Sequence, residues 1–87
     1  MVRPDRRETE KSRYLVESVM RACDLLEAFR AEGELLGLGD LATRAGLGKT
    51  TAFRLLRTLE ERGLVVRAGS GRYRLNVRPL TRSRWRL

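Results

Sequence analysis

Residues 40–65, DLATRAGLGKTTAFRLLRTLEERGLV, decide the fold of this chain. The residues before Gly46 predict a helix of about two turns, after which this glycine lets the backbone reverse and Leu47 enter the core. A longer helix follows and ends near Gly63, since glycine is common just after a helix. Its inward stripe is predicted by apolar residues at i, i+3, i+4 and i+7, namely Ala52, Leu55, Leu56 and Leu59. Two helices joined by a tight turn predict a helix-turn-helix.

The letters GKT at residues 48–50 also occur at the end of a nucleotide-binding P-loop. That motif needs a further glycine at position 43, where this chain has Thr43. It also needs a buried strand leading into the loop, whereas residues 39–46, GDLATRAG, predict a short helix. A P-loop, and with it a nucleotide hydrolase, is therefore excluded.

Upstream of this motif the sequence predicts a charged arm followed by a first helix. Residues 1–13 lack apolar periodicity and indicate a flexible arm. Residues 15–31 predict an amphipathic helix that ends near Gly33, with the cysteine of its apolar stripe as a small core residue. The apolar positions of this helix are Leu15, Val16, Val19, Met20, Ala22, Cys23, Leu26 and Phe29.

Two stretches predict β-structure. Residues 34–39, ELLGLG, predict a short strand that includes Leu36 and Leu38. Residues 64–75, LVVRAGSGRYRL, predict a hairpin with AGSG as its turn. Alternation along its second strand predicts inward side chains at Tyr73 and Leu75 and outward ones at Arg72 and Arg74.

These elements predict a fold that is mainly α with a small β-hairpin wing (α+β), the winged helix-turn-helix. We expect the domain to span residues 14–77. Residues 78–87 are interpreted as a basic tail or a truncated linker, in which Trp85 is either exposed or an anchor against the domain.

Composition narrows the function classes. The chain has 87 residues, enough for one small domain, and no apolar run approaches the roughly 18 residues of a membrane span. Its N-terminus is too charged for a signal peptide, which favours a cytoplasmic protein. The chain contains no histidine and a single cysteine, so we expect no metal site, no cofactor, no catalytic residues and no enzyme activity.

Charge distribution points to nucleic acid. The net charge is +8 and the isoelectric point is about 11.2. Residues 1–61 hold 11 basic and 11 acidic side chains, whereas residues 62–87 hold eight arginines and no acid. Arginine pairs bidentately with phosphate, so this C-terminal excess favours phosphate binding over a merely solvated surface.

Residues 16–76 resemble the N-terminal DNA-binding domain of IclR-type bacterial transcription regulators. The shared order is a short helix, a Gly-Leu turn, Lys-Thr-Thr, an aromatic-Arg-Leu-Leu run, Leu-Glu-x-x-Gly-Leu and a wing strand, here GRYRL. MarR-like and other winged-helix regulators share parts of this order. The resemblance implies that the helix after Gly48 enters the major groove and that the first helix helps to pair two domains.

The chain departs from the family pattern at two glycines and in its length. The family usually has Pro where this chain has Gly48, and Ser or Thr where it has Gly39 before the second helix, so we expect a looser motif. Family members also carry an effector-binding domain after a linker helix. We therefore expect no small-molecule effector site in this chain, which is either a natural stand-alone domain or a truncation.

The candidate DNA-binding residues lie on the predicted recognition helix and on the wing. Arg54 lies opposite the inward stripe and is expected to read a base, because the bidentate Arg–guanine pair is the commonest specific contact. The first turn of this helix is expected to hold a phosphate through Lys49, Thr50 and Thr51. The wing is expected to grip the DNA backbone or minor groove through Arg67, Arg72 and Arg74.

Two further positions on the recognition helix keep alternatives. Phe53 either contacts a thymine methyl or packs against a partner or the first helix. Arg57 is interpreted as a phosphate contact or as an i,i+4 partner of Glu61. The overall prediction is a transcription regulator that binds a specific double-stranded DNA sequence as a homodimer. The alternative is a winged-helix module for RNA binding or protein interaction.

Overall fold

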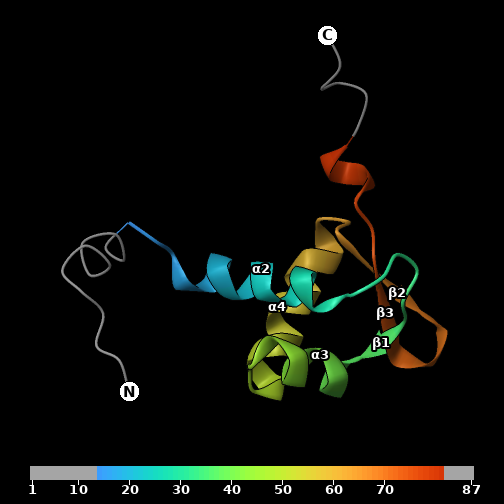
Figure 1. Ribbon diagram of the computed structural model, residues 1–87, viewed down its shortest axis with the longest axis horizontal. Coiled ribbons are helices and arrows are strands. Elements are labelled where there is room, and N and C mark those ends of the chain that lie inside the picture. The colour runs from blue at the N-terminus through green and yellow to red at the C-terminus, as the bar shows by residue number, and fades with distance from the viewer. Residues whose placement is uncertain (1–13, 82–87) are drawn as a thin grey trace, which may run out of the picture.

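The computed structural model of the protein describes residues 14–81. The predicted arm, residues 1–13, and the end of the predicted tail, residues 82–87 with Trp85, lie outside this range. Within it the predicted winged helix-turn-helix is confirmed (Figure 1). The elements are α2 (Glu17–Ala28), β1 (Leu36–Gly37), α3 (Leu38–Ala45), α4 (Lys49–Glu61), β2 (Val65–Ala68), the 3₁₀ turn η1 (Gly69–Gly71), β3 (Arg72–Leu75) and the 3₁₀ turn η2 (Arg78–Leu80).

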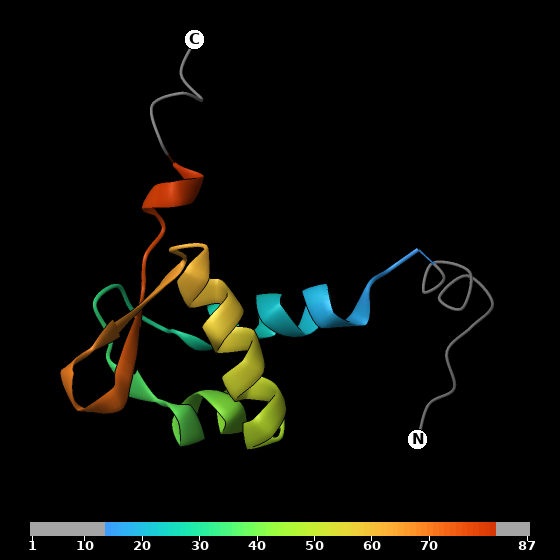
Figure 2. The same cartoon turned by 180° about the vertical axis from the view of Figure 1, so that it is seen from behind.

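Only the C-terminal half of α2 belongs to the core. Leu25 is fully buried there, and Ala28 and the C-cap residue Phe29 are nearly so. The helix packs against both α3 and α4. The N-terminal half extends past the rest of the domain, which Figures 1 and 2 show from opposite sides. None of the helices in the described range is long and apolar enough to cross a membrane.

The prediction that Cys23 is a core residue is wrong, because this cysteine is exposed. The apolar residues of the stripe from Leu15 to Met20 are exposed as well, so they do not belong to the core of the single chain. The stripe also omitted Leu25, the best-buried residue of the helix. Periodicity shows that a helix has an apolar face, but it does not show how far along the helix the neighbouring elements reach.

Glycines end both helices of the helix-turn-helix. Gly46 has φ 71° and ψ 33°, and its N–H bonds the carbonyl oxygens at the end of α3, so the predicted reversal is confirmed. Gly63, with φ 78°, follows α4 in the same left-handed conformation. A side chain with a Cβ is strained there, which explains why both turns use glycine.

The start of α3 differs from the prediction. The helix begins at Leu38, which was predicted as strand, and its N-cap is Gly37. Gly39 therefore lies inside the first turn rather than before the helix. The reason is that β1 is only a two-residue strand, Leu36–Gly37, after which the chain turns directly into α3.

The wing is part of a three-stranded antiparallel sheet with the order β1-β3-β2. In the hairpin, Arg67 pairs with Tyr73 and Val65 with Leu75, while β1 adds Leu36 beside Tyr73. Tyr73 is 3% exposed, so its predicted place in the wing core is confirmed. The sheet, α2, α3 and α4 enclose one core whose fully buried side chains include Leu25, Leu41, Leu56 and Val65.

Candidate nucleic-acid interface

The N-terminus of α4 offers backbone donors and short polar side chains. Its N-cap, Gly48, has no side chain to cap the helix, and the first helical bond runs from the N–H of Ala52 to the oxygen of Gly48 at 3.0 Å. The N–H groups of the first turn therefore remain available to an anion. Around them lie Lys49 and Thr50, both exposed, and Thr51, which is half-buried.

The outer face of α4 carries one aromatic and two arginine side chains. Phe53 is 40% exposed, and the guanidinium carbon of Arg57 lies 5.9 Å from the centroid of its ring. Arg54, the candidate base reader, is exposed on the same helix. The inward stripe predicted for α4 is confirmed, because Ala52 and Leu56 are fully buried.

Some arginines of the described range form ion pairs with acidic side chains and others do not. The ion pairs among residues 14–81 are Arg21–Glu17, Arg44–Glu34 and Arg67–Glu60. No pair joins Arg57 to Glu61 in this range, so the i,i+4 interpretation of Arg57 is not met. The arginines of α4 and of β3 likewise have no acidic partner there, which leaves their charges free for an anionic ligand.

The wing arginines lie on opposite faces of the hairpin. Arg72 and Arg74 are exposed on one face, as the alternation of β3 predicted. Arg67 lies on the other face, the one that carries Tyr73, because cross-strand partners share a face. Its Nη2 donates a 3.3 Å hydrogen bond to the hydroxyl of Tyr73 and lies 3.6 Å from a carboxylate oxygen of Glu60.

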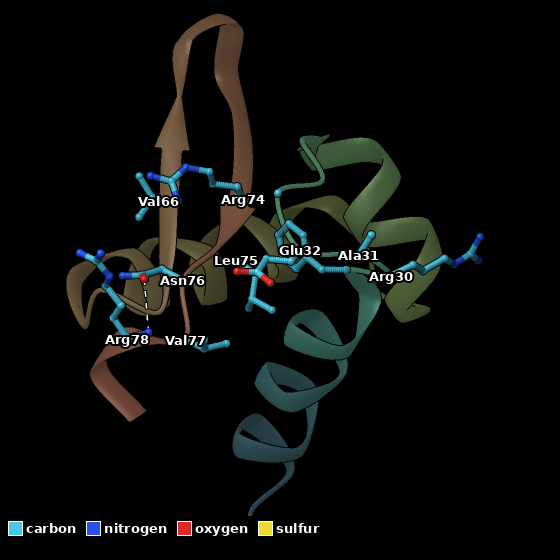
Figure 3. Close-up of a pocket in the computed structure, with 11 residues that line it drawn as sticks. Arg30, Ala31, Glu32, Val66, Arg74, Leu75, Asn76, Val77 and Arg78 are labelled. Carbon is cyan, nitrogen blue, oxygen red and sulfur yellow. Dashed lines mark hydrogen bonds between the residues drawn. The ribbon is translucent and has the colours of Figure 1, made fainter. Parts of the chain in front are cut away.

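A cavity of about 660 Å³ lies beside the outward face of the wing. Apolar side chains such as Val66 and Leu75 line it, together with Arg30, Arg74 and Arg78. Figure 3 shows Arg74 and Arg78 on the side of the hairpin and Arg30 pointing away from both. The three guanidinium groups therefore do not converge on one point, and Arg74 stays free to contact a ligand of the wing.

A second polar cluster ties α2 to α3. Arg44 Nη1 lies 3.1 Å from both carboxylate oxygens of Glu34 and donates a 3.0 Å hydrogen bond to the carbonyl oxygen of Ala28. The N–H of Arg30 donates to the same carboxylate, and this bond together with Arg44 holds the pKa of Glu34 below its usual range. Sequence reasoning missed this cluster because its central residue, Arg44, is ten positions from Glu34 and sixteen from Ala28, and such separations match no local spacing.

Groups that could hold a metal are absent from the described range. No cluster of three or more His, Cys, Asp or Glu side chains occurs among residues 14–81. The chemistry that the site offers is therefore charge and hydrogen-bond donation from lysine, threonine, arginine and helix N–H groups.

Comparisons of the sequence and of the fold with known proteins find the same helix-turn-helix. The sequence model of the IclR helix-turn-helix domain matches residues 18–69. A glycerol operon regulatory protein from Streptomyces coelicolor is 40% identical over 63 residues, which cover 71% of this chain and 25% of that protein. The matched segment is thus a quarter of the relative's length.

Two solved structures are similar in fold and sequence. An IclR-family transcriptional regulator from Brucella abortus aligns with a TM-score of 0.71 and 32% identity, covering 78% of this chain and 26% of that one. An IclR-family protein from Rhodococcus sp. aligns with a TM-score of 0.65 and 29% identity, covering 98% of this chain and 30% of that one.

Proposed function

This chain belongs to the IclR helix-turn-helix family of DNA-binding domains, and from that premise we propose that it binds a specific double-stranded DNA sequence and regulates transcription. One observation carries the proposal: no Asp or Glu occurs between Leu41 and Leu59, the stretch that holds the turn and most of α4. Duplex DNA carries a negative charge about every 1.7 Å, so a stretch that has exposed cations and no acid before the last turn of α4 is drawn to it.

Each part of α4 has a proposed role. The free N–H groups of its first turn, with Lys49, hold a phosphate and fix the depth of the helix in the major groove. Arg54 reads a base, preferably guanine, because its guanidinium matches the O6 and N7 acceptors. Phe53 contacts a thymine methyl, and Arg57, which lies over its ring, contacts a phosphate.

The wing supplies further backbone contacts in this proposal. Arg72 and Arg74 are the wing residues that grip phosphates or the minor groove, because both are exposed and without an acidic partner in the described range. These contacts add affinity for any duplex, whereas the base contact of α4 adds preference for one sequence.

We also propose that the protein acts as a homodimer through α2. Val16, Val19, Met20 and Cys23 follow helical spacing, and all are exposed in the single chain. Tyr14 and Leu15, which precede the helix, are exposed as well, so exposed apolar side chains run along the N-terminal part of α2 and the residues just before it. This part of α2 projects from the rest of the domain (Figure 2). A second copy related by a two-fold axis offers the same surface in return, which would bury both.

A two-fold dimer reads two half-sites. Its two recognition helices enter the groove about 34–36 Å apart, one turn of the duplex, or at a multiple of that distance. The DNA target is then a palindrome or near-palindrome. The proposed place of action is the cytoplasm, where bacterial DNA lies.

Selection of bound fragments from a random duplex library tests this function. A palindromic motif enriched over unselected DNA is the expected result. Enrichment without any common motif, or equal affinity for a structured RNA of the same length, would contradict sequence-specific duplex binding. The Arg54→Ala variant is the control, since the same selection with it should lose information at the guanine that Arg54 reads.

A further inference from the structure

We propose that Arg67 is a positioning residue, which sets the orientation of the wing relative to α4 through Glu60 and Tyr73 and does not itself bind DNA. This inference rests on the proposed DNA-binding function and assigns one of its arginines a different task. The three residues come from the end of α4, from β2 and from β3.

The guanidinium group of Arg67 makes three contacts with Tyr73 and Glu60. Its Nη2 donates to the Tyr73 hydroxyl at 3.3 Å and faces a Glu60 carboxylate oxygen at 3.6 Å. Its guanidinium carbon also lies 5.4 Å from the centroid of the Tyr73 ring, within cation–π range. The guanidinium is thus held by a ring, a hydroxyl and a carboxylate together.

Both partners of Arg67 are well anchored. Tyr73 is 3% exposed and lies in the central strand, where it pairs with Leu36 of β1 and with Arg67 itself. Glu60 lies in the last turn of α4. The carbonyl oxygen of Glu60 accepts a hydrogen bond from the N–H of Gly63, which fixes the end of the helix. Arg67 therefore connects the recognition helix to the wing core.

The outer part of β2 depends on this connection. At the base of the hairpin, the N–H of Leu64 donates a hydrogen bond to the carbonyl oxygen of Leu59. The next residue, Val65, is 1% exposed, so the start of β2 is held by the core. Farther along, β2 is an edge strand with β3 on one side only. Within the described range, Arg67 is the β2 side chain that forms an ion pair with α4, and it lies just before the wing turn.

The partial exposure of this ion pair argues for a role in holding the wing locally rather than in the overall stability of the domain. The side chains of Arg67 and Glu60 are 43% and 34% exposed, and pairs of that kind add little to the free energy of unfolding. Hydrogen bonds to phosphate weaken steeply with distance and angle, so a small rotation of the hairpin weakens every phosphate contact that it makes.

Whether the Glu60→Gln change raises or lowers affinity for duplex DNA tests the proposal. Glu60→Gln removes a negative charge near DNA, which by simple electrostatics raises affinity for a duplex. If Arg67 needs Glu60 to hold the wing, the same change lowers affinity, by about 3- to 10-fold on the selected duplex. Glu61→Gln is the matched control, because Glu61 neighbours Glu60 and makes no ion pair among residues 14–81.

A double-mutant cycle then connects the two residues. Arg67→Met keeps a long apolar stem and removes the charge, and it should lower affinity by a similar factor. Combining it with Glu60→Gln should lower the affinity by less than a further 2-fold, since the two residues act through one contact. The proposal is overturned if Glu60→Gln raises affinity as Glu61→Gln does, or if the two losses multiply.

Amide hydrogen exchange of the free protein separates this inference from the function on which it rests. Exchange in β2 and β3 should be faster in Glu60→Gln than in Glu61→Gln, while α3 and the first half of α4 are unchanged. Equal exchange in the two variants overturns the positioning role. A wild-type protein that prefers no duplex overturns the proposed function instead, and the exchange result still decides whether Arg67 orients the wing.

Discussion

Arg44 Nη1 donates a 3.0 Å hydrogen bond to the carbonyl oxygen of Ala28, which joins the last turn of α3 to the last residue of α2. The same guanidinium contacts Glu34 in the loop between these helices. The helix proposed to form the dimer and the helix-turn-helix proposed to bind DNA, which already share the hydrophobic core, are therefore also joined by one polar side chain. In the proposed dimer, this link would help to fix how each helix-turn-helix is oriented relative to its partner's.

We predict that Arg44→Met lowers the free energy of unfolding by about 1–2 kcal/mol, because the carbonyl of Ala28 and the carboxylate lose a charged donor. Urea titration followed by circular dichroism measures this loss. Arg72→Met is the control, since Arg72 is exposed and should change stability by less than about 0.5 kcal/mol. Equal effects of the two changes would show that the Arg44 contacts add nothing to stability.

The lowered pKa of Glu34 gives a pH prediction. The N–H of Arg30 and the Arg44 guanidinium favour the ionised carboxylate, so its pKa is depressed in the folded protein. Its contribution to stability is therefore present above the unfolded pKa of about 4.3 and is lost as the pH falls through the lower folded value. Glu34→Gln should make the unfolding free energy less dependent on pH in this acidic range.

Thermal unfolding of wild type and Glu34→Gln at a series of pH values below neutrality measures this dependence. Glu32→Gln serves as the control, because Glu32 lies in the same loop and makes no ion pair among residues 14–81. A variant at position 34 that keeps the wild-type pH profile would contradict the prediction.

For sequence readout, we predict that Arg54→Ala weakens binding to the selected duplex by about 1–3 kcal/mol and changes binding to random DNA little. A base contact is lost only where the right base is present, whereas a phosphate contact is lost everywhere. Fluorescence anisotropy on both duplexes measures the two affinities. An equal loss on both would assign Arg54 to the phosphate backbone.

The salt dependence of binding tests the wing. Each arginine that neutralises a phosphate contributes about −0.9 to the slope of log affinity against log salt concentration. We predict that changing Arg72 and Arg74 to Ala flattens this slope more than deleting residues 82–87 does. Sequence preference should be largely kept in both variants. If the deletion flattened the slope more than the two alanine changes do, the main phosphate contacts would be the C-terminal arginines and not those of the wing.

For assembly, we predict that the protein sediments as a dimer and that Val19→Glu makes it a monomer. Val19 is 58% exposed in the middle of the apolar surface of α2, so a buried carboxylate there would lack a partner in the dimer. Sedimentation equilibrium of the free protein and of its DNA complex gives the molecular mass. The surface control is Glu27→Gln on the same helix, which should leave the mass unchanged.

The sequence by itself determined the elements whose signals are local. The spacing of Ala52, Leu56 and Leu59 marked the buried face of α4, and Gly46 and Gly63 marked the ends of two helices. Alternation in β3 separated Tyr73 from Arg72 and Arg74. These features follow from backbone geometry within a few residues, so no knowledge of distant parts of the chain was needed.

Only the tertiary structure decided which residues meet across elements. It exposed the first half of α2 and Cys23, because α3 and α4 cover that helix only near Leu25 and Ala28. It likewise paired Arg67 with Glu60 and placed it on the face of the wing opposite Arg74. Such contacts depend on how the elements pack in space, and their residues share no period or motif from which the sequence could reveal them.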